Sequence, residues 1–207
     1  MPADLPRLAV LISGRGSNLQ AIIDAIGDGR VRAEIAVVIS NVEAAQGLAR
    51  ADAAGIPTRV LPYRGWPTRE AYDSALADTL RDQRVDLVCL AGFMRFLSPA
   101  FIDAFAHRIL NIHPSLLPSF PGLDAQKQAL EYGVQVTGVT VHFVNAQLDA
   151  GPIVLQAAVP VLPEDTAATL AARILREEHR VYPEAIRRIL DGGWHIDGRR
   201  FVQRRRD

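Results

Sequence analysis

The chain has 207 residues, 49% of them hydrophobic, which suits one domain or two tightly joined halves. Basic and acidic residues number 23 each, so the chain offers no net basic field to hold a nucleic acid. No stretch approaches the roughly 18 apolar residues of a membrane helix, and the first residues lack the long apolar run of a signal peptide.

The first half of the chain alternates short apolar runs with amphipathic segments. The apolar runs predict four buried strands, at residues 7–13, 34–40, 58–62 and 86–92. The segments between them predict three helices, at residues 17–29, 44–55 and 67–83. Strands that are apolar throughout and alternate with helices indicate a parallel sheet covered on both faces. The only cysteine, Cys89, lies in the fourth run, so we expect a buried thiol and a reducing, cytoplasmic compartment.

The second half is less regular. Its patterns predict strands at residues 107–112, 136–145 and 152–161, and helices at residues 125–133 and from Thr166 onward. We expect Pro183 to break or kink the last helix and to begin a final turn that ends at Leu190. An Asp-Gly pair then predicts a hairpin. The basic residues 199–207 are interpreted as a solvated tail, with an RNA-binding arm as the alternative.

Together these elements predict an α/β fold. We expect a doubly wound, mostly parallel sheet with helices on both faces and a Rossmann-like N-terminal half. The sequence contains no internal repeat, low-complexity tract or linker, so we expect a single domain over residues 1–207. Its two halves are expected at about residues 1–105 and 106–207.

The loop SGRGSNLQ, residues 13–20, joins the first predicted strand to the first predicted helix. In a doubly wound sheet this loop lies at the carboxyl end of the strands, where ligands bind. Gly14 and Gly16 permit unusual backbone angles and the close approach of a ligand, and Ser17 and Asn18 are good helix caps. Helix amides and the positive end of the helix dipole favour a phosphate there. A plain tight turn is the structural alternative.

The loop does not match the two common nucleotide motifs. Leu19 stands where the dinucleotide pattern needs a third glycine, and Ser40 and Asn41 stand where it needs an acidic residue. No Gly-Lys-Ser/Thr is present after the loop, so the Walker pattern fails as well. We therefore expect a phosphate on a small substrate rather than a nicotinamide dinucleotide.

The stretch LNIHPSLLPSFPG, residues 110–122, places Asn111 two residues before His113. In extended backbone this spacing puts both side chains on one face, about 6.5–7 Å apart at the backbone. Pro114 favours an extended conformation at His113, and two further prolines stiffen the next residues of the chain. Asn can stabilise a developing oxyanion and His can carry a proton near neutral pH, so we interpret the pair as catalytic. A structural histidine at a strand end is the alternative.

Three further polar side chains are candidates for the site. Asp149, in the turn NAQLDAGPI, either caps that turn or orients the His113 imidazole. His142 shares a strand face with Thr140 and is a candidate residue behind the catalytic pair. Glu178 falls on the apolar stripe of the last helix and needs a partner, for which an arginine and the hydroxyls or amine of a ligand fit equally well. The histidines have no i, i+4 pairing and no cysteine partner, so we expect no metal site.

Five motifs occur in order along the chain: LISGRGSNLQAIID, AGFMRFLS, LNIHPSLLPSFPGL, TGVTVHFV and LDAGPIVLQ. Together they resemble the glycinamide ribonucleotide formyltransferase family of de novo purine synthesis, over about residues 7–190. The HPSLLP element alone is shared by several enzymes that use 10-formyltetrahydrofolate, and the glycine loop and chain length narrow the choice. Methionyl-tRNA formyltransferase and formyltetrahydrofolate deformylase each carry an additional domain that we do not expect in 207 residues.

The resemblance implies a role for each motif. It assigns Asn111, His113 and Asp149 to catalysis and Glu178 to the ribose or amine of glycinamide ribonucleotide. It assigns the phosphate of that substrate to Gly16, Ser17 and Asn18. The implied contacts of the folate are Arg69 at its glutamate tail, Asn111, and two segments that frame the pterin: Met94, Arg95, Phe96 and Leu97, and Asn145, Ala146, Gln147, Leu148 and Asp149.

The implied reaction is formyl transfer from the co-substrate 10-formyltetrahydrofolate to the amine of glycinamide ribonucleotide, without a metal. The implied partners are small molecules, with no nucleic acid and no membrane, and the protein is expected to be a monomer or a homodimer. Asp124 and Gln126 stand where some family members have histidines, which leaves any role of these two positions open. The alternatives are hydrolysis of the formyl-folate, against which the phosphate loop argues, and a non-catalytic folate- or nucleotide-binding module.

Overall fold

The computed structural model describes residues 4–204, and the chain divides into two compact units, residues 1–110 and 111–207. The end of the basic tail, residues 205–207, lies outside the described residues. Within the described range, no helix is both long and apolar enough to cross a membrane.

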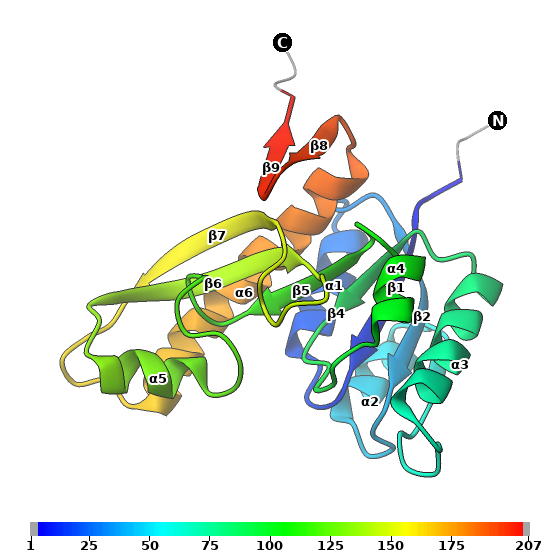
Figure 1. Ribbon diagram of the computed structural model, residues 1–207, viewed down its shortest axis with the longest axis horizontal. Helices are drawn as coiled ribbons and strands as arrows, with labels where there is room; N and C mark the ends of the chain where they lie inside the picture. The colour runs from blue at the N-terminus through cyan, green and yellow to red at the C-terminus, as the bar shows by residue number, and fades with distance from the viewer. Residues whose placement is uncertain (1–3, 205–207) are drawn as a thin grey trace. The chain divides into compact units, whose positions relative to one another are not determined.

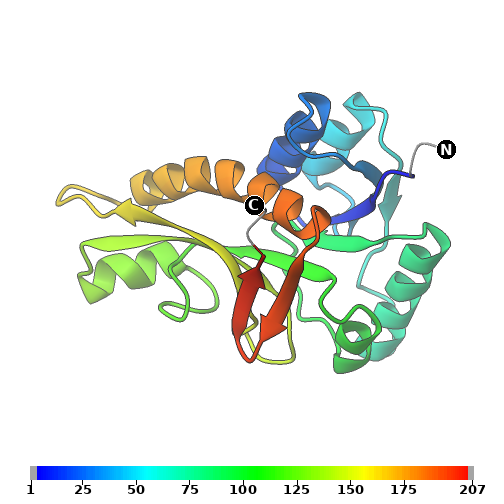
Figure 2. The same cartoon turned by 90° about the horizontal axis from the view of Figure 1, so that it is seen from above.

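The first unit is a parallel sheet with helices on both faces (Figures 1 and 2). Its strands are hydrogen-bonded in the order β3-β2-β1-β4, and the neighbouring pairs are parallel. Their bounds are β1 Arg7–Ile12, β2 Glu34–Ser40, β3 Thr58–Val60 and β4 Leu87–Leu90. Leu8, Ile12 and Cys89 are fully buried, because an apolar strand covered by helices has no face toward water.

Four helices cover this sheet: α1 Ser17–Gly27, α2 Gln46–Ala53, α3 Arg69–Asp82 and α4 Pro99–Ala104. The sequence patterns do not predict α4, because six residues are too few to show a helical period. Local chemistry starts it instead: the Ser98 hydroxyl accepts a hydrogen bond from the Phe101 N–H, and Pro99 occupies the first turn.

The second unit combines an antiparallel strand pair with one long helix. Strands β6 and β7 are antiparallel, and α6 runs along them (Figure 2). The hairpin of β8 and β9 joins this unit where β9 pairs with β7. The bounds are β5 Ile109–His113, which contains the boundary between the units, α5 Ala125–Tyr132, β6 Val136–Phe143, β7 Ile153–Pro160, α6 Ala167–Leu190, β8 Trp194–Asp197 and β9 Arg200–Gln203.

Helix α6 continues through Pro183, so the predicted break and separate final turn are wrong. Proline removes one helical hydrogen bond and costs about 3 kcal/mol in a helix interior. The buried stripe extends to both sides of it, with Val181, Tyr182, Ala185 and Ile186 fully buried. Packing of this stripe therefore outweighs the missing hydrogen bond.

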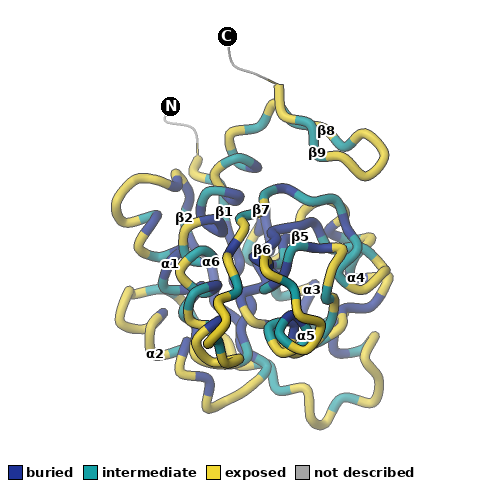
Figure 3. The backbone as a smooth tube through the Cα atoms, turned by 90° about the vertical axis from the view of Figure 1, so that its left-hand side faces the viewer, coloured by how far each residue is buried: buried dark blue, intermediate teal, exposed yellow. Residues whose placement is uncertain are grey.

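The predicted α/β class with a mostly parallel central sheet is confirmed. The seven predicted strands and the predicted hairpin occur close to their expected positions, and buried strands appear in dark blue in Figure 3. The hairpin is mostly exposed or half-buried, and Gly198 at its turn has φ 59, which matches the Asp-Gly signal.

Candidate active site

Two loops of the first unit meet at the carboxyl edge of its sheet. Chain order reverses where β1 lies beside β4, and doubly wound sheets bind ligands at such a point. The Ser13 hydroxyl lies just after β1 and accepts a hydrogen bond from the Met94 N–H, with an N···O distance of 2.9 Å. It also donates to Asn41 Oδ1 at 2.6 Å. The glycine loop, residues 13–18, therefore lies beside the predicted folate segment, residues 94–97.

Gly16 is the residue from which helix α1 starts. Its φ is 69°, and no side chain caps the helix, so the prediction that Ser17 and Asn18 act as caps is wrong. A Cβ on Gly16 would lie 2.5 Å from Gly47 Cα, whereas one on Gly14 would meet nothing within 4 Å. Gly16 is thus required by close packing against helix α2, and a helix start without a side-chain cap suits an anion.

The predicted folate contacts of the first unit differ in exposure. Met94 and Phe96 leave 69% and 66% of their surfaces exposed, whereas Leu97 is buried. Arg69 begins α3 on the surface, and its Nη2 lies 3.6 Å from Glu70 Oε1. Met94 and Phe96 therefore place two exposed apolar side chains next to the loop after β1.

The Arg95 guanidinium faces aromatic rings of its own unit. It lies 3.3 Å from the Tyr63 ring centroid and 4.7 Å from the Tyr72 ring centroid. Burial raises the pKa of Tyr72 to about 12, so its phenol stays uncharged beside the cation. The Arg95 side chain therefore packs against the rings of its own unit.

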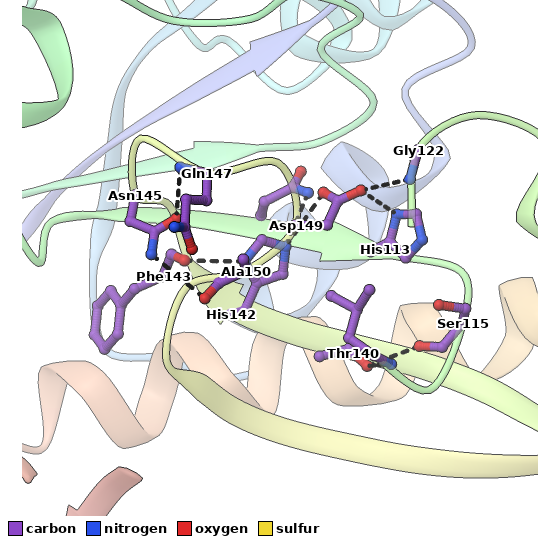
Figure 4. A network of polar contacts seen from close by, with 12 residues as sticks. His113, Ser115, Gly122, Thr140, His142, Phe143, Asn145, Gln147, Asp149 and Ala150 are labelled. Atoms are coloured by element: carbon purple, nitrogen blue, oxygen red, sulfur yellow. Dashed lines mark hydrogen bonds and ion pairs between the residues drawn. The ribbon is translucent and has the colours of Figure 1, made fainter. Parts of the chain in front are cut away.

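The second unit brings the three predicted catalytic residues together: His113 and Asp149 face each other in Figure 4, and Asn111 joins them through His142. Asn111 and His113 extend from β5, and Asp149 lies in the loop between β6 and β7. Asp149 Oδ2 lies 3.5 Å from His113 Nδ1 and accepts a hydrogen bond from the Gly122 N–H at 2.8 Å. The His113 and Asp149 side chains are only 6% and 10% exposed, so water does little to screen their interaction.

The other ring nitrogen of His113 also faces an oxygen. His113 Nε2 lies 2.8 Å from the carbonyl oxygen of Phe120. A carbonyl and a carboxylate can only accept, so the doubly protonated ring satisfies both contacts as a donor. The geometry therefore suits an imidazolium beside the Asp149 carboxylate.

His142 holds the amide of Asn111. His142 Nδ1 lies 2.9 Å from the Phe143 carbonyl oxygen, so Nδ1 carries the proton and Nε2 is the acceptor. Asn111 Nδ2 donates to that Nε2 at 3.2 Å. Burial, the largest cause, lowers the pKa of His142 and favours the neutral ring that this contact needs. His142 thus orients the Asn111 side chain from behind, and its Nε2 lies 3.8 Å from Asp149 Oδ1.

The proline-rich segment, residues 114–121, is tied to the strands of the second unit. The Thr140 hydroxyl accepts from the Leu117 N–H at 3.0 Å and donates to the Ser115 carbonyl at 2.7 Å (Figure 4). Gln156 Nε2 donates to the Leu117 carbonyl and to Thr140 Oγ1, both at 2.9 Å. The segment is therefore held by side chains of β6 and β7 in addition to its own prolines.

The loop between β6 and β7 is closed by Asn145. Asn145 Oδ1 accepts from the Gln147 N–H at 3.1 Å, and Nδ2 donates to the Ala150 carbonyl at 3.3 Å. Three predicted folate contacts of this loop are exposed: Ala146, Gln147 and Leu148. Asp149 has φ 46, a left-handed conformation that is uncommon outside glycine.

The remaining predicted positions lie on helices of the second unit. Glu178 is buried on the stripe of α6, as the sequence pattern predicts. Asp124 is the left-handed N-cap of α5, and Gln126 lies in its first turn. No group of three or more His, Cys, Asp or Glu side chains that could hold a metal occurs among residues 4–204.

Comparisons with known proteins show to which family this chain belongs. A family model described as formyl transferase matches residues 6–186. The chain belongs to the formyl transferase family. It is 48% identical over 192 residues to phosphoribosylglycinamide formyltransferase of Escherichia coli strain K12, covering 93% of this chain and 88% of that protein. A crystal structure of glycinamide ribonucleotide transformylase 1 from Symbiobacterium toebii superposes with a TM-score of 0.94 at 55% identity, covering 97% of this chain and 94% of that one.

Other relatives in the formyl transferase family are much longer. The human trifunctional purine biosynthetic protein adenosine-3 is 52% identical over 186 residues, which is 90% of this chain. The chain spans only 18% of the length of that relative. The resemblance predicted from the five motifs is confirmed by these matches.

Sequence reasoning missed several residues that hold the loops of this candidate site in place. They are Ser13, Gly47, Gly122 and Gln156. Each makes a contact with a residue at least 20 positions away in the chain, so no local pattern marks it. For Asn41, its position directly after β2 is the available signal for its contact with the first loop.

Proposed function

We propose that this formyl transferase moves the formyl group of 10-formyltetrahydrofolate, as co-substrate, to the amine of glycinamide ribonucleotide. The observation that carries this proposal is the convergence of an amide, an imidazole and a carboxylate from Asn111, His113 and Asp149. Formyl transfer between nitrogens needs a stabilised oxyanion and a carrier for protons, and this set can supply both. The choice of substrate is supported by the relatives, which are named for formyl transfer to glycinamide ribonucleotide.

In the proposed reaction, the substrate amine attacks the formyl carbon and the carbonyl oxygen gains negative charge. The Asn111 amide has two N–H groups, and His142 takes one of them, which leaves the second for this oxygen. Protonated His113 supplies the other donor, and the substrate oxygen takes the place of the Phe120 carbonyl at Nε2.

Two protons must move as the bonds change. The attacking amine loses a proton, and N10 of the folate receives one as its bond to the formyl carbon breaks, so the products are the formylated ribonucleotide and tetrahydrofolate. Asp149 keeps His113 oriented and charged for this transfer. Groups held within hydrogen-bonding distance on a buried scaffold save the entropy of bringing them together.

The remaining roles rest on the family resemblance. We propose that Gly16, Ser17 and Asn18 hold the substrate phosphate, that Glu178 contacts its ribose or amine, and that Arg69 meets the glutamate tail of the folate. The pterin contacts are proposed for residues 94–97 and 145–149, where Met94, Phe96 and Leu148 are exposed apolar side chains. The reaction is proposed to take place in the cytoplasm with small molecules as the partners.

A spectrophotometric assay tests the function. The protein is mixed with 10-formyltetrahydrofolate, with and without glycinamide ribonucleotide, and the folate absorbance is monitored. An absorbance change that requires the ribonucleotide is expected. The same rate without the ribonucleotide would show hydrolysis instead, and saturable folate binding without any change would show a binding module.

A further inference from the structure

The C-terminal hairpin, residues 194–203, lies beyond residues 6–186 that the family model matches. It is nevertheless anchored in the second unit. The Trp194 ring centroid lies 5.3 Å from that of Phe143, at the end of β6, and 5.6 Å from that of Phe201. Strand β9 also pairs with the start of β7. The hairpin therefore flanks both ends of the loop between β6 and β7 (Figure 2).

At the hairpin turn, a charged side chain reaches this loop. Arg199 Nη2 donates to the Ala150 carbonyl oxygen at 2.8 Å. Asn145 Nδ2 donates to the same oxygen at 3.3 Å, from within the loop. Ala150 is the residue directly after Asp149, so a donor from outside the loop fixes the peptide next to the proposed catalytic carboxylate.

This peptide is fixed from its other end as well. A Cβ on Gly151 would clash with the Phe143 carbonyl, so the backbone of Gly151 is pressed against the end of β6. Asp149 itself has φ 46. A residue keeps such a strained backbone conformation only where contacts with the surrounding structure restrain it. Arg199 and Gly151 together supply that restraint on the two sides of the Ala150–Gly151 peptide.

We propose that Arg199 is a positioning residue: it holds the loop of Asp149 so that the carboxylate stays aligned with His113 during formyl transfer. This inference rests on the proposed function, because the alignment matters only if Asp149 acts on His113. Since Asn145 remains as a second donor, the loss of Arg199 loosens the loop without releasing it.

The test compares three full-length variants with the wild type. Arg199→Ala removes the donor, and Arg199→Lys restores one N–H on a flexible stem. Arg200→Ala is the matched control, because the Arg200 side chain makes no hydrogen bond or ion pair within the described part of the chain. Two measurements are made on each protein: steady-state kinetics against each substrate, and amide hydrogen exchange of a peptide that spans residues 144–151.

For Arg199→Ala we expect kcat to fall about three- to tenfold, the usual effect of one lost hydrogen bond, with the KM for glycinamide ribonucleotide unchanged. Exchange of the loop peptide should become faster, Arg199→Lys should recover part of both effects, and Arg200→Ala should show neither. Normal kcat in Arg199→Ala, or an equal loss in Arg200→Ala, would overturn the proposal. If the wild type transferred no formyl group, the proposed function would fail, and unchanged loop exchange in Arg199→Ala would separately overturn the restraint itself.

Discussion

The loop after β1 and the loop between β6 and β7 are held in place by opposite means. The first depends on missing atoms: a Cβ on Gly16 would lie 2.5 Å from Gly47 Cα, and one on Gly47 would lie 2.6 Å from Ile12 Cδ1 and 3.1 Å from Gly16 Cα. The second depends on polar atoms that are present, because Asn145, Arg199 and the Gly122 N–H each hold one of its oxygens. The first loop should therefore lose its conformation when a Cβ is added to one of its glycines. The second should lose its conformation when one of these polar groups is removed.

The largest effect is expected from the histidine of the second region. His113→Ala should lower kcat by roughly 10²–10⁴, the usual contribution of a positioned acid or base. Asp149→Asn should also cause a large loss while folate binding is mostly retained, and the double variant should lose little more than His113→Ala alone. Steady-state kinetics and folate titration measure this. Losses that simply multiply in the double variant would mean that Asp149 acts independently of His113.

A somewhat smaller loss is expected at the amide. Asn111→Ala should lower kcat on the order of 10²–10³, because it removes a donor aimed at the developing oxyanion. Circular dichroism on the same preparation controls for folding. A folded variant with turnover close to that of the wild type would remove Asn111 from the proposed chemistry.

The first region is tested by adding one methyl group. Gly16→Ala would put a Cβ 2.5 Å from Gly47 Cα at a residue with φ 69, so the loop must shift. We expect the KM for glycinamide ribonucleotide to rise about tenfold, within the range of 1–3 kcal/mol for an overpacked contact, with little change in folate affinity. Gly27→Ala is the control, because a Cβ there meets nothing within 4 Å. Equal weakening of both ligands would indicate general damage instead.

The smallest effect is a pH dependence of stability that comes from His142. Because burial lowers its pKa in the folded chain, the unfolded chain binds more protons below the ordinary value of about 6.5. The free energy of unfolding is therefore expected to be higher at neutral pH and to fall as the pH drops below that value, because protons then bind the unfolded chain preferentially. Urea unfolding at pH 7.5 and 5.5 should show a flatter dependence in His142→Gln than in the wild type. Identical slopes would contradict the neutral assignment.

The elements of the fold were largely predictable, because apolar runs and helical periods are local properties of the sequence. Strand alternation also placed Asn111 and His113 on one strand, and the apolar stripe of the last helix predicted the burial of Glu178. Pro183 was misjudged because its local cost is opposed by packing that only the folded chain provides.

Contacts between distant segments could not be predicted from local patterns. The bond from Asn111 to His142 spans 31 positions and fixes the tautomer of the ring. The sequence suggested that position 16 is a glycine to leave room for a ligand. The structure shows that a glycine is needed there because helix α2 packs against it at Gly47. Such contacts depend on the strand order, which a single sequence does not reveal.

The neutral state of His142 has a further consequence for the charge balance at the site. Asp149 lies near two imidazoles, and if both were protonated, this buried cluster would carry a net charge of +1. With His142 neutral and His113 protonated, the three groups sum to zero, which keeps the desolvation cost of the cluster low. In the proposed reaction, the negative charge that develops on the formyl oxygen would then form beside the imidazolium of His113, in a cluster that carries no net charge beforehand.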